Sequence, residues 1–209
     1  MHHIREDNRK LVESLGYNFN PNLPLTESVE VSKSSQEIEN RLLTLHAIVA
    51  FSYGCPKTKV KAWLEHNELI EELTSLEYEH LFGSSSLPEA RFKWQVEALW
   101  TLAWSVSLVD ELDFSTECSD NLIDLLPDIL KIEPLDWFNR KINLRDANEI
   151  LSKLDLAYCI HWAVNHRKLS NIPNIPNKPM VQDGVIVERR WALEWIIGKD
   201  EWDDVQLDT

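Results

Sequence analysis

Four ionisable side chains fall on segments that otherwise have the apolar character of buried helices: Glu97, His161, Glu188 and Arg189. Ionisable groups in apolar surroundings often have shifted pKa values, and enzymes use such groups as acids, bases and anion-binding residues. The structural alternative is that each group is neutral, or is paired with an opposite charge inside the fold. A chemical role and a structural role are therefore both open at each position.

Glu97 is the only charged residue in the apolar stretch 96–109. At 100° per residue it lies on the same side of a helix as Trp94, Trp100 and Trp104. Three outcomes are open for this carboxylate: pairing with a cation inside the fold, extension to the surface, or service as a catalytic acid with a raised pKa. The three tryptophans could stack a ring-shaped ligand beside it, which makes them candidate binding residues.

Two charges fall on the apolar side of the predicted helix 185–197, namely Glu188 and Arg189. Each of them needs a partner elsewhere in the fold. An arginine side chain can satisfy a carboxylate with two hydrogen bonds, so we expect Arg189 to pair with Glu97.

Two further charges of that helix lie on its polar side. Arg190 and Glu194 are four residues apart, the spacing at which side chains meet on a helix surface. We expect them to form an exposed pair that contributes roughly 0.3–0.5 kcal/mol.

His161 lies on the nearly all-apolar helix predicted for 145–168. A lone histidine in that position is most often a satisfied core residue, and the alternative is a proton carrier. His161 and His166 are five residues apart, not the four that allows two histidines of one helix to bind one zinc ion. No motif typical of a nucleotide or redox cofactor occurs either, and we expect neither metal nor cofactor.

The chain ends in an acidic tail, 199–209, which contains Trp202, Asp203 and Asp204. A solvated tail, a docked tail and a metal-binding tail are the alternatives. An exposed indole leaves much apolar area in water. We therefore predict that the tail docks, that Trp202 is buried, and that Asp203 or Asp204 accepts hydrogen bonds from arginine or from helix N-terminal amides. The two aspartates are candidate binding residues.

The chain has 209 residues and a formal net charge of −14. No basic segment is long enough to attract phosphates locally, so we expect no nucleic-acid partner, whereas a basic protein partner remains open. The longest apolar stretch is too short to span a membrane. Three cysteines and the absence of a signal peptide predict a cytoplasmic protein. The oligomeric state stays open.

Hydrophobic periodicity predicts a mainly-α fold, a single-domain helical bundle over 1–209 with no internal repeat. Residues 1–33 form an N-terminal helix and an irregular arm, and 169–183 form a loop rich in proline and asparagine. Two long helices, 88–109 and 145–168, are expected to pack together at the centre because both are too apolar to face water. Capping-box spacing and helix-stop residues predict four further helices at 4–15, 34–52, 58–66 and 75–82, and a short one at 120–126.

Five blocks of sequence resemble one known family: EALWTLAWSVSLVDEL (97–112), TECSD (116–120), LDLAYCIHWAV (154–164), VERRWALEWIIG (187–198) and WDDVQLDT (202–209). The chain resembles the bacterial domain of unknown function 4272 over nearly its whole length. Glu194 departs from the polar residue, such as asparagine, that is common at its position in the fourth block. The resemblance implies a soluble bacterial protein with one folded unit, and it supplies no catalytic residue.

Two classes of function remain. The first is a non-enzymatic protein-interaction or accessory module, because no complete catalytic constellation is present. The alternative is a hydrolase-type enzyme with Glu97 or Glu188 as acid or base, His161 as proton carrier and Arg189 as anion clamp in a tryptophan-lined pocket. An open pocket that contains these groups would favour the enzyme, whereas sealed and mutually paired groups would favour the module.

Overall fold

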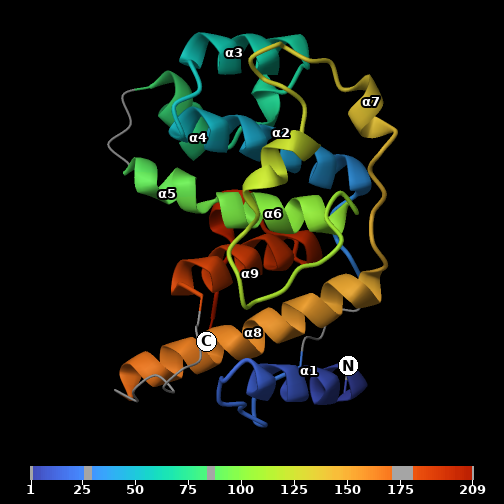
Figure 1. Ribbon diagram of the computed structural model, residues 1–209, viewed down its shortest axis with the longest axis vertical. Coiled ribbons are helices and arrows are strands. Elements are labelled where there is room, and N and C mark those ends of the chain that lie inside the picture. The colour runs from blue at the N-terminus through green and yellow to red at the C-terminus, as the bar shows by residue number, and fades with distance from the viewer. Residues whose placement is uncertain (1, 26–29, 84–87, 171–180, 209) are drawn as a thin grey trace.

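The computed structural model describes residues 2–25, 30–83, 88–170 and 181–208, and it confirms a mainly-α fold (Figure 1). No strand occurs among the described residues. The α-helices are α1 His2–Ser14, α2 Ser35–Ser52, α3 Lys57–His66, α4 Ser75–Phe82, α5 Glu89–Trp94, α6 Val96–Ser105, α7 Asp136–Asn139, α8 Ala147–Leu169 and α9 Asp183–Ile197. The described part of the chain also contains three short 3-10 helices, η1 Ile70–Glu72, η2 Asp120–Leu125 and η3 Trp202–Asp204.

Capping boxes open α2 and α4, as the spacing S-x-x-E at 34–37 and T-x-x-E at 74–77 predicts. The Ser34 side chain accepts from the backbone N–H of Glu37, and the Glu37 carboxylate accepts from the backbone N–H of Ser34. Thr74 and Glu77 repeat this exchange at the start of α4. Each reciprocal pair satisfies donors that a helix N-terminus leaves free, and this local chemistry explains why α2 and α4 begin where the sequence predicts.

The helices pack in a succession that runs through the molecule: α1 on α8, α8 on α9, α9 on α6, and α6 on α2, with α3 and α4 against the far side of α2 (Figure 1). The contact of α1 with α8 includes a buried ion pair in which Arg5 Nε donates to Asp155 Oδ1 over 2.8 Å. Asn8 donates to the other oxygen of Asp155. The N-terminal helix is thereby held against a segment 150 residues away in the chain.

The predicted helix 88–109 is divided, and this prediction was wrong in its bounds. α5 ends and α6 begins around Gln95, and the chain leaves the helical conformation after Ser105, where Ser107 has a left-handed φ of 63°. The break places the Trp94 ring against Gly184 at the start of α9, where a Cβ would lie 2.9 Å from the ring. Continuous apolar spacing across Gln95 concealed this change of direction.

α9 lies between α6 and α8, so the two helices expected to pack together at the centre do not form a direct central pair. Most of the predicted loop 169–183 and part of the predicted arm lie outside the described residues, at 171–180 and 26–29. None of the described helices combines the length and the apolar character needed to cross a membrane. All three cysteines are free thiols.

The C-terminal tail packs on the body through Trp202, which is 2% exposed. Its ring meets that of Trp195 edge-to-face at a centroid distance of 5.4 Å, and its carbonyl accepts from Trp191 Nε1 over 3.0 Å. The expected role of the aspartates was wrong: among the described residues, neither Asp203 nor Asp204 accepts a side-chain hydrogen bond from arginine or from a helix N-terminus. The tail is instead attached through its backbone carbonyls: Lys33 donates to the carbonyl of Asp200, and Arg190 donates to the carbonyl of Asp208.

Deletion of residues 201–209 should lower the melting temperature by roughly 6–20 °C. Loss of a fully buried tryptophan costs about 3–5 kcal/mol, and each kcal/mol shifts the midpoint of a chain of this size by about 2–4 °C. Differential scanning calorimetry of the full-length and shortened chains measures the difference. Gln206→Ala, at an exposed tail position, should melt with the parent. A shortened chain that also melts with the parent would mean that the tail adds no stability.

Candidate functional site

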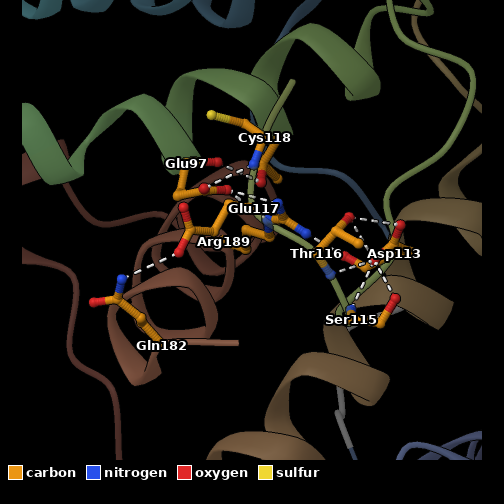
Figure 2. Close-up of polar contacts among 9 residues, drawn as sticks. Glu97, Asp113, Ser115, Thr116, Glu117, Cys118, Gln182 and Arg189 are labelled. Atoms are coloured by element: carbon orange, nitrogen blue, oxygen red, sulfur yellow. Dashed lines mark hydrogen bonds and ion pairs between the residues drawn. The ribbon is translucent and has the colours of Figure 1, made fainter. Parts of the chain in front are cut away.

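The carboxylate of Glu97 and the guanidinium of Arg189 form the predicted ion pair. Arg189 Nε and Nη2 both donate to Glu97 Oε2, over 2.9 and 2.6 Å. Glu97 lies in the first turn of α6 and Arg189 in the middle of α9, and their exposed fractions are 2% and 1%. The pairing predicted from the two helical wheels is confirmed, and it links two helices at their interface (Figure 2).

The same pair also holds the segment that follows α6. Glu97 Oε1 accepts from the backbone N–H of Cys118 over 2.8 Å, and Arg189 Nη1 donates to the carbonyl of Asp113 (Figure 2). Within the segment, the Asp113 carboxylate accepts from the backbone N–H groups of Ser115 and Thr116. Since each Glu97 oxygen has a donor, the pair is satisfied by the protein itself and has the character of a structural contact.

The thiol of Cys118 lies beside this pair. Burial, together with the neighbouring Glu97 carboxylate, raises the pKa of Cys118 to about 12. A thiol with that pKa is protonated at neutral pH, and the thiolate is the reactive form. At neutral pH the unreactive thiol form of Cys118 therefore lies beside the pair.

Glu97 also lines a cavity of about 560 Å³. Its walls come mainly from apolar side chains of α2, α6 and the segment 117–126, such as Val49, Leu99 and Leu122. Neither Arg189 nor His161 lines it. Of the four ionisable residues that the hydrolase hypothesis would combine, the cavity therefore contains Glu97 alone.

His161 lies on the other side of α9. Its Nδ1 accepts from Arg190 Nη1 over 2.8 Å, and burial together with the nearby Arg190 charge lowers the pKa of His161 to about 4. The expectation that Arg190 is exposed was wrong: it is 3% exposed, and it also bonds Glu194 Oε1 and the carbonyl of Asp208. The helical wheel assigned Arg190 to the polar, exposed side of α9, but in the structure α8 and the tail cover that side.

Glu188 has no hydrogen bond or ion pair among the described residues. Burial raises its pKa to about 7, although the positive charge of Arg91 opposes the shift. It does not line the cavity beside Glu97. The negative charge of Glu97 also raises the pKa of Glu188, and Glu97 itself is already bonded to Arg189.

The predicted tryptophans do not share one pocket. Trp94 lines the cavity beside Glu97. Trp104 borders a different hollow, where the guanidinium of Arg145 lies 5.0 Å from its ring centroid. Trp100 lines neither hollow. The break at Gln95 separates Trp94 from the tryptophans of α6, so one helical wheel could not place all three.

A third hollow of about 730 Å³, the acidic pocket, lies between the start of α2, the segment 71–76 and the tail. Two tryptophans, Trp195 and Trp202, and two cations, Lys33 and Arg41, contribute to its walls. Glu37 also lines it but serves the α2 cap. The pocket has five further carboxylates, and none of them has a side-chain hydrogen bond or ion pair with another described residue: Glu71, Glu72, Glu201, Asp203 and Asp204.

Asp203 and Asp204 were predicted as binding residues, whereas Glu71, Glu72 and Glu201 were missed. In the sequence these acidic residues occur as EE at 71–72 and EWDD at 201–204, and nothing in the two patterns indicates that the segments meet in space. No group of three or more His, Cys, Asp or Glu side chains in the described part of the chain is arranged to hold a metal ion. The five carboxylates Glu71, Glu72, Glu201, Asp203 and Asp204 therefore do not converge on one point, and we call them the rim of the acidic pocket.

A double-mutant cycle measures the buried pair. Glu97→Ala and Arg189→Ala should each destabilise the protein by about 3–5 kcal/mol, because each leaves a buried charge without its partner. The double variant should cost clearly less than the sum of the two. Urea unfolding gives the free energies, and the exposed pair Arg9–Glu13 (3.1 Å) serves as control with an expected coupling below about 1 kcal/mol. Additive costs at Glu97 and Arg189 would contradict a coupled pair.

Glu188 should make stability depend on pH between about 4.5 and 7. Its pKa is raised in the folded state, from 4.5 to about 7, so the folded protein binds the proton more tightly and loses stability as pH rises through this range. Glu188→Gln should therefore be roughly 1–3 kcal/mol more stable than the parent at pH 8 and equal to it at pH 4.5. Urea unfolding at both pH values tests this. The exposed Asp124→Asn is the control, and an unchanged difference at the two pH values would refute the shift.

Comparison with curated proteins and with solved structures gave no significant match. A family model does match, the one described as a domain of unknown function, DUF4272, and it covers residues 4–205. This is nearly the whole chain, and it includes α6, α9 and the tryptophan of the tail. The resemblance seen in the five sequence blocks is confirmed, and the chain belongs to the DUF4272 family.

Proposed function

We propose that the protein is a non-enzymatic interaction module that binds a basic segment of a partner protein in the acidic pocket. One observation carries the proposal: five carboxylates line this pocket, at Glu71, Glu72, Glu201, Asp203 and Asp204, and none has a partner among the described residues. Carboxylates gathered around a hollow repel one another, and that repulsion is relieved when a cation enters.

The arrangement of these groups favours a peptide over a metal ion. A divalent cation needs several oxygen ligands at about 2.0–2.6 Å from one point, and the described carboxylates do not form such a group. Lysine and arginine side chains of one segment lie several ångströms apart, so they can meet carboxylates that are spread around a rim. The two indoles in the wall, Trp195 and Trp202, add apolar area for the stems of long cationic side chains.

The charge of the whole chain supports the same class of partner. A formal net charge of −14 attracts a basic protein over distances comparable with the Debye length and repels nucleic acid. Association steered in this way is fast at low ionic strength and weakens as salt is added.

The hydrolase alternative has less support from the geometry. Glu97 and Arg189 are bonded to each other, and His161 is bonded to Arg190 on the other side of α9. Glu188 is affected by the charge of Glu97 but has no hydrogen bond or ion pair among the described residues. No two of these groups line the same one of the three hollows described above, whereas acid–base catalysis requires groups that face one reacting atom.

A lysine-containing peptide tests the proposal. An octapeptide with two lysines should bind at low ionic strength, and the same peptide with norleucine in place of lysine should not. The double variant Asp203→Asn/Asp204→Asn should weaken binding about three- to thirtyfold, since each exposed charge pair contributes up to about 1 kcal/mol. Isothermal titration calorimetry at about 20 and 300 mM salt measures both effects.

The matched control removes two carboxylates from another hollow. Asp110→Asn/Glu111→Gln changes the net charge by the same amount, and both residues border the hollow at Trp104, not the acidic pocket. This variant should bind like the parent. Equal loss in the two double variants would mean that only the overall charge matters, and the acidic pocket would no longer be the site.

A further inference from the structure

Two buried N–H donors in the wall of the acidic pocket have no acceptor among the described residues: Arg41 Nε and Trp202 Nε1. The two residues are 5% and 2% exposed. A buried donor without an acceptor costs about 1–3 kcal/mol, and nearly all such groups in folded proteins are satisfied. Both donors belong to residues that line one pocket, so they are the groups there that an acceptor from outside the chain would satisfy.

The two donors are neighbours. The guanidinium of Arg41 lies over the Trp202 ring, with its Cζ 5.0 Å from the centroid. Arg41 Nη2 donates to the buried carboxylate of Glu77, whereas Arg41 Nε has no acceptor among the described residues. Lys33 contributes a second positive charge to the pocket. The wall therefore contains two cationic groups and two N–H donors without an acceptor among the described residues, and Glu77 balances the charge of Arg41.

The rim has the opposite character. Glu71, Glu72, Glu201 and Asp204 are exposed, and all carry negative charge. A simple anion would be drawn to the buried donors and repelled by the rim, whereas a simple cation would leave the donors unsatisfied. The ligand that suits both parts carries an anionic acceptor and, a side chain's length away, a cation.

We propose that the acidic pocket recognises the C-terminal residue of a chain that ends in lysine or arginine. Its terminal carboxylate accepts from Arg41 Nε and Trp202 Nε1, and its cationic side chain extends to the carboxylates of the rim. This inference rests on the proposed function and deepens it, because it names which part of a basic partner enters the pocket. A carboxylate bonded by a guanidinium forms the stronger, charge-assisted kind of hydrogen bond, which an internal peptide carbonyl cannot match.

Two peptides that differ only at the terminus test the proposal. Both end in lysine, one with a free carboxylate and one with an amide, and isothermal titration calorimetry compares them at about 20 mM salt. The free carboxylate should bind at least tenfold more tightly. A third peptide, with a free carboxylate but norleucine as its last residue, should lose a similar factor because it cannot meet the rim.

A matched pair of variants locates the effect. Trp202→Phe removes the unpartnered N–H and keeps an aromatic ring, so it should abolish the preference for the free carboxylate. Trp191→Phe removes an indole N–H that already has a partner, the carbonyl of Trp202, so it should keep the preference. If Trp202→Phe fails to fold, NMR of the parent protein provides the test instead. The ¹⁵N–¹H indole resonance of Trp202 should then shift when the carboxylate peptide is added and should not shift with the amide peptide.

The outcomes separate the two proposals. Equal binding of the carboxylate and amide peptides, with loss in the norleucine peptide, would overturn recognition of a terminus and leave the basic-segment proposal standing. No binding by any peptide would overturn both, with an ordered water as the acceptor for the two donors. Equal binding of the norleucine and lysine peptides would show a plain carboxylate site, and this too would overturn the proposal.

Discussion

The buried ion pair between Glu97 and Arg189 is the contact on which the centre of the molecule depends. Removing two charges from water costs several kcal/mol each, and the fold recovers this only where the geometry satisfies both groups. Arg189 reaches Glu97 with two donors and uses a third on the Asp113 carbonyl, while Glu97 also accepts from Cys118. A shift of α9 along α6 by one turn would leave all these groups unsatisfied. The pair therefore sets the register of the two helices and the path of the segment 113–118.

α9 acts as the organising element because three consecutive residues of it bond with three different parts of the chain. Arg189 bonds α6 and the segment after it, Arg190 bonds His161 of α8 and the carbonyl of Asp208, and Trp191 bonds the carbonyl of Trp202. A helix with neighbours on every side has no polar face in the ordinary sense. Its polar groups are used for attachment, which is why a short apolar helix contains so many of them.

The sequence predicts best what depends on local chemistry. Capping boxes at Ser34 and Thr74 are visible as spacing, and the pairing of Glu97 with Arg189 follows from two charges that each lie on an apolar wheel face. Arg190 was misjudged because a wheel assigns an exposed face to every helix, whereas α8 and the tail cover this one. The acidic pocket could not be predicted, since its walls come from segments around 33–41, 71–76 and 195–204. The break at Gln95 was hidden because apolar spacing continues across it.

The attachment of α1 to α8 has a consequence for the order in which the protein is made. Arg5 and Asp155 are separated by 150 residues, which a ribosome adds in roughly 8–30 s at about 5–20 residues per second. Throughout that interval α1 has emerged but has no surface on which to bury Val12, a residue with no exposed area in the folded chain. A nascent chain halted before residue 155 therefore presents α1, a mostly polar helix, with Val12 uncovered and with Arg5 and Asn8 lacking their partner Asp155.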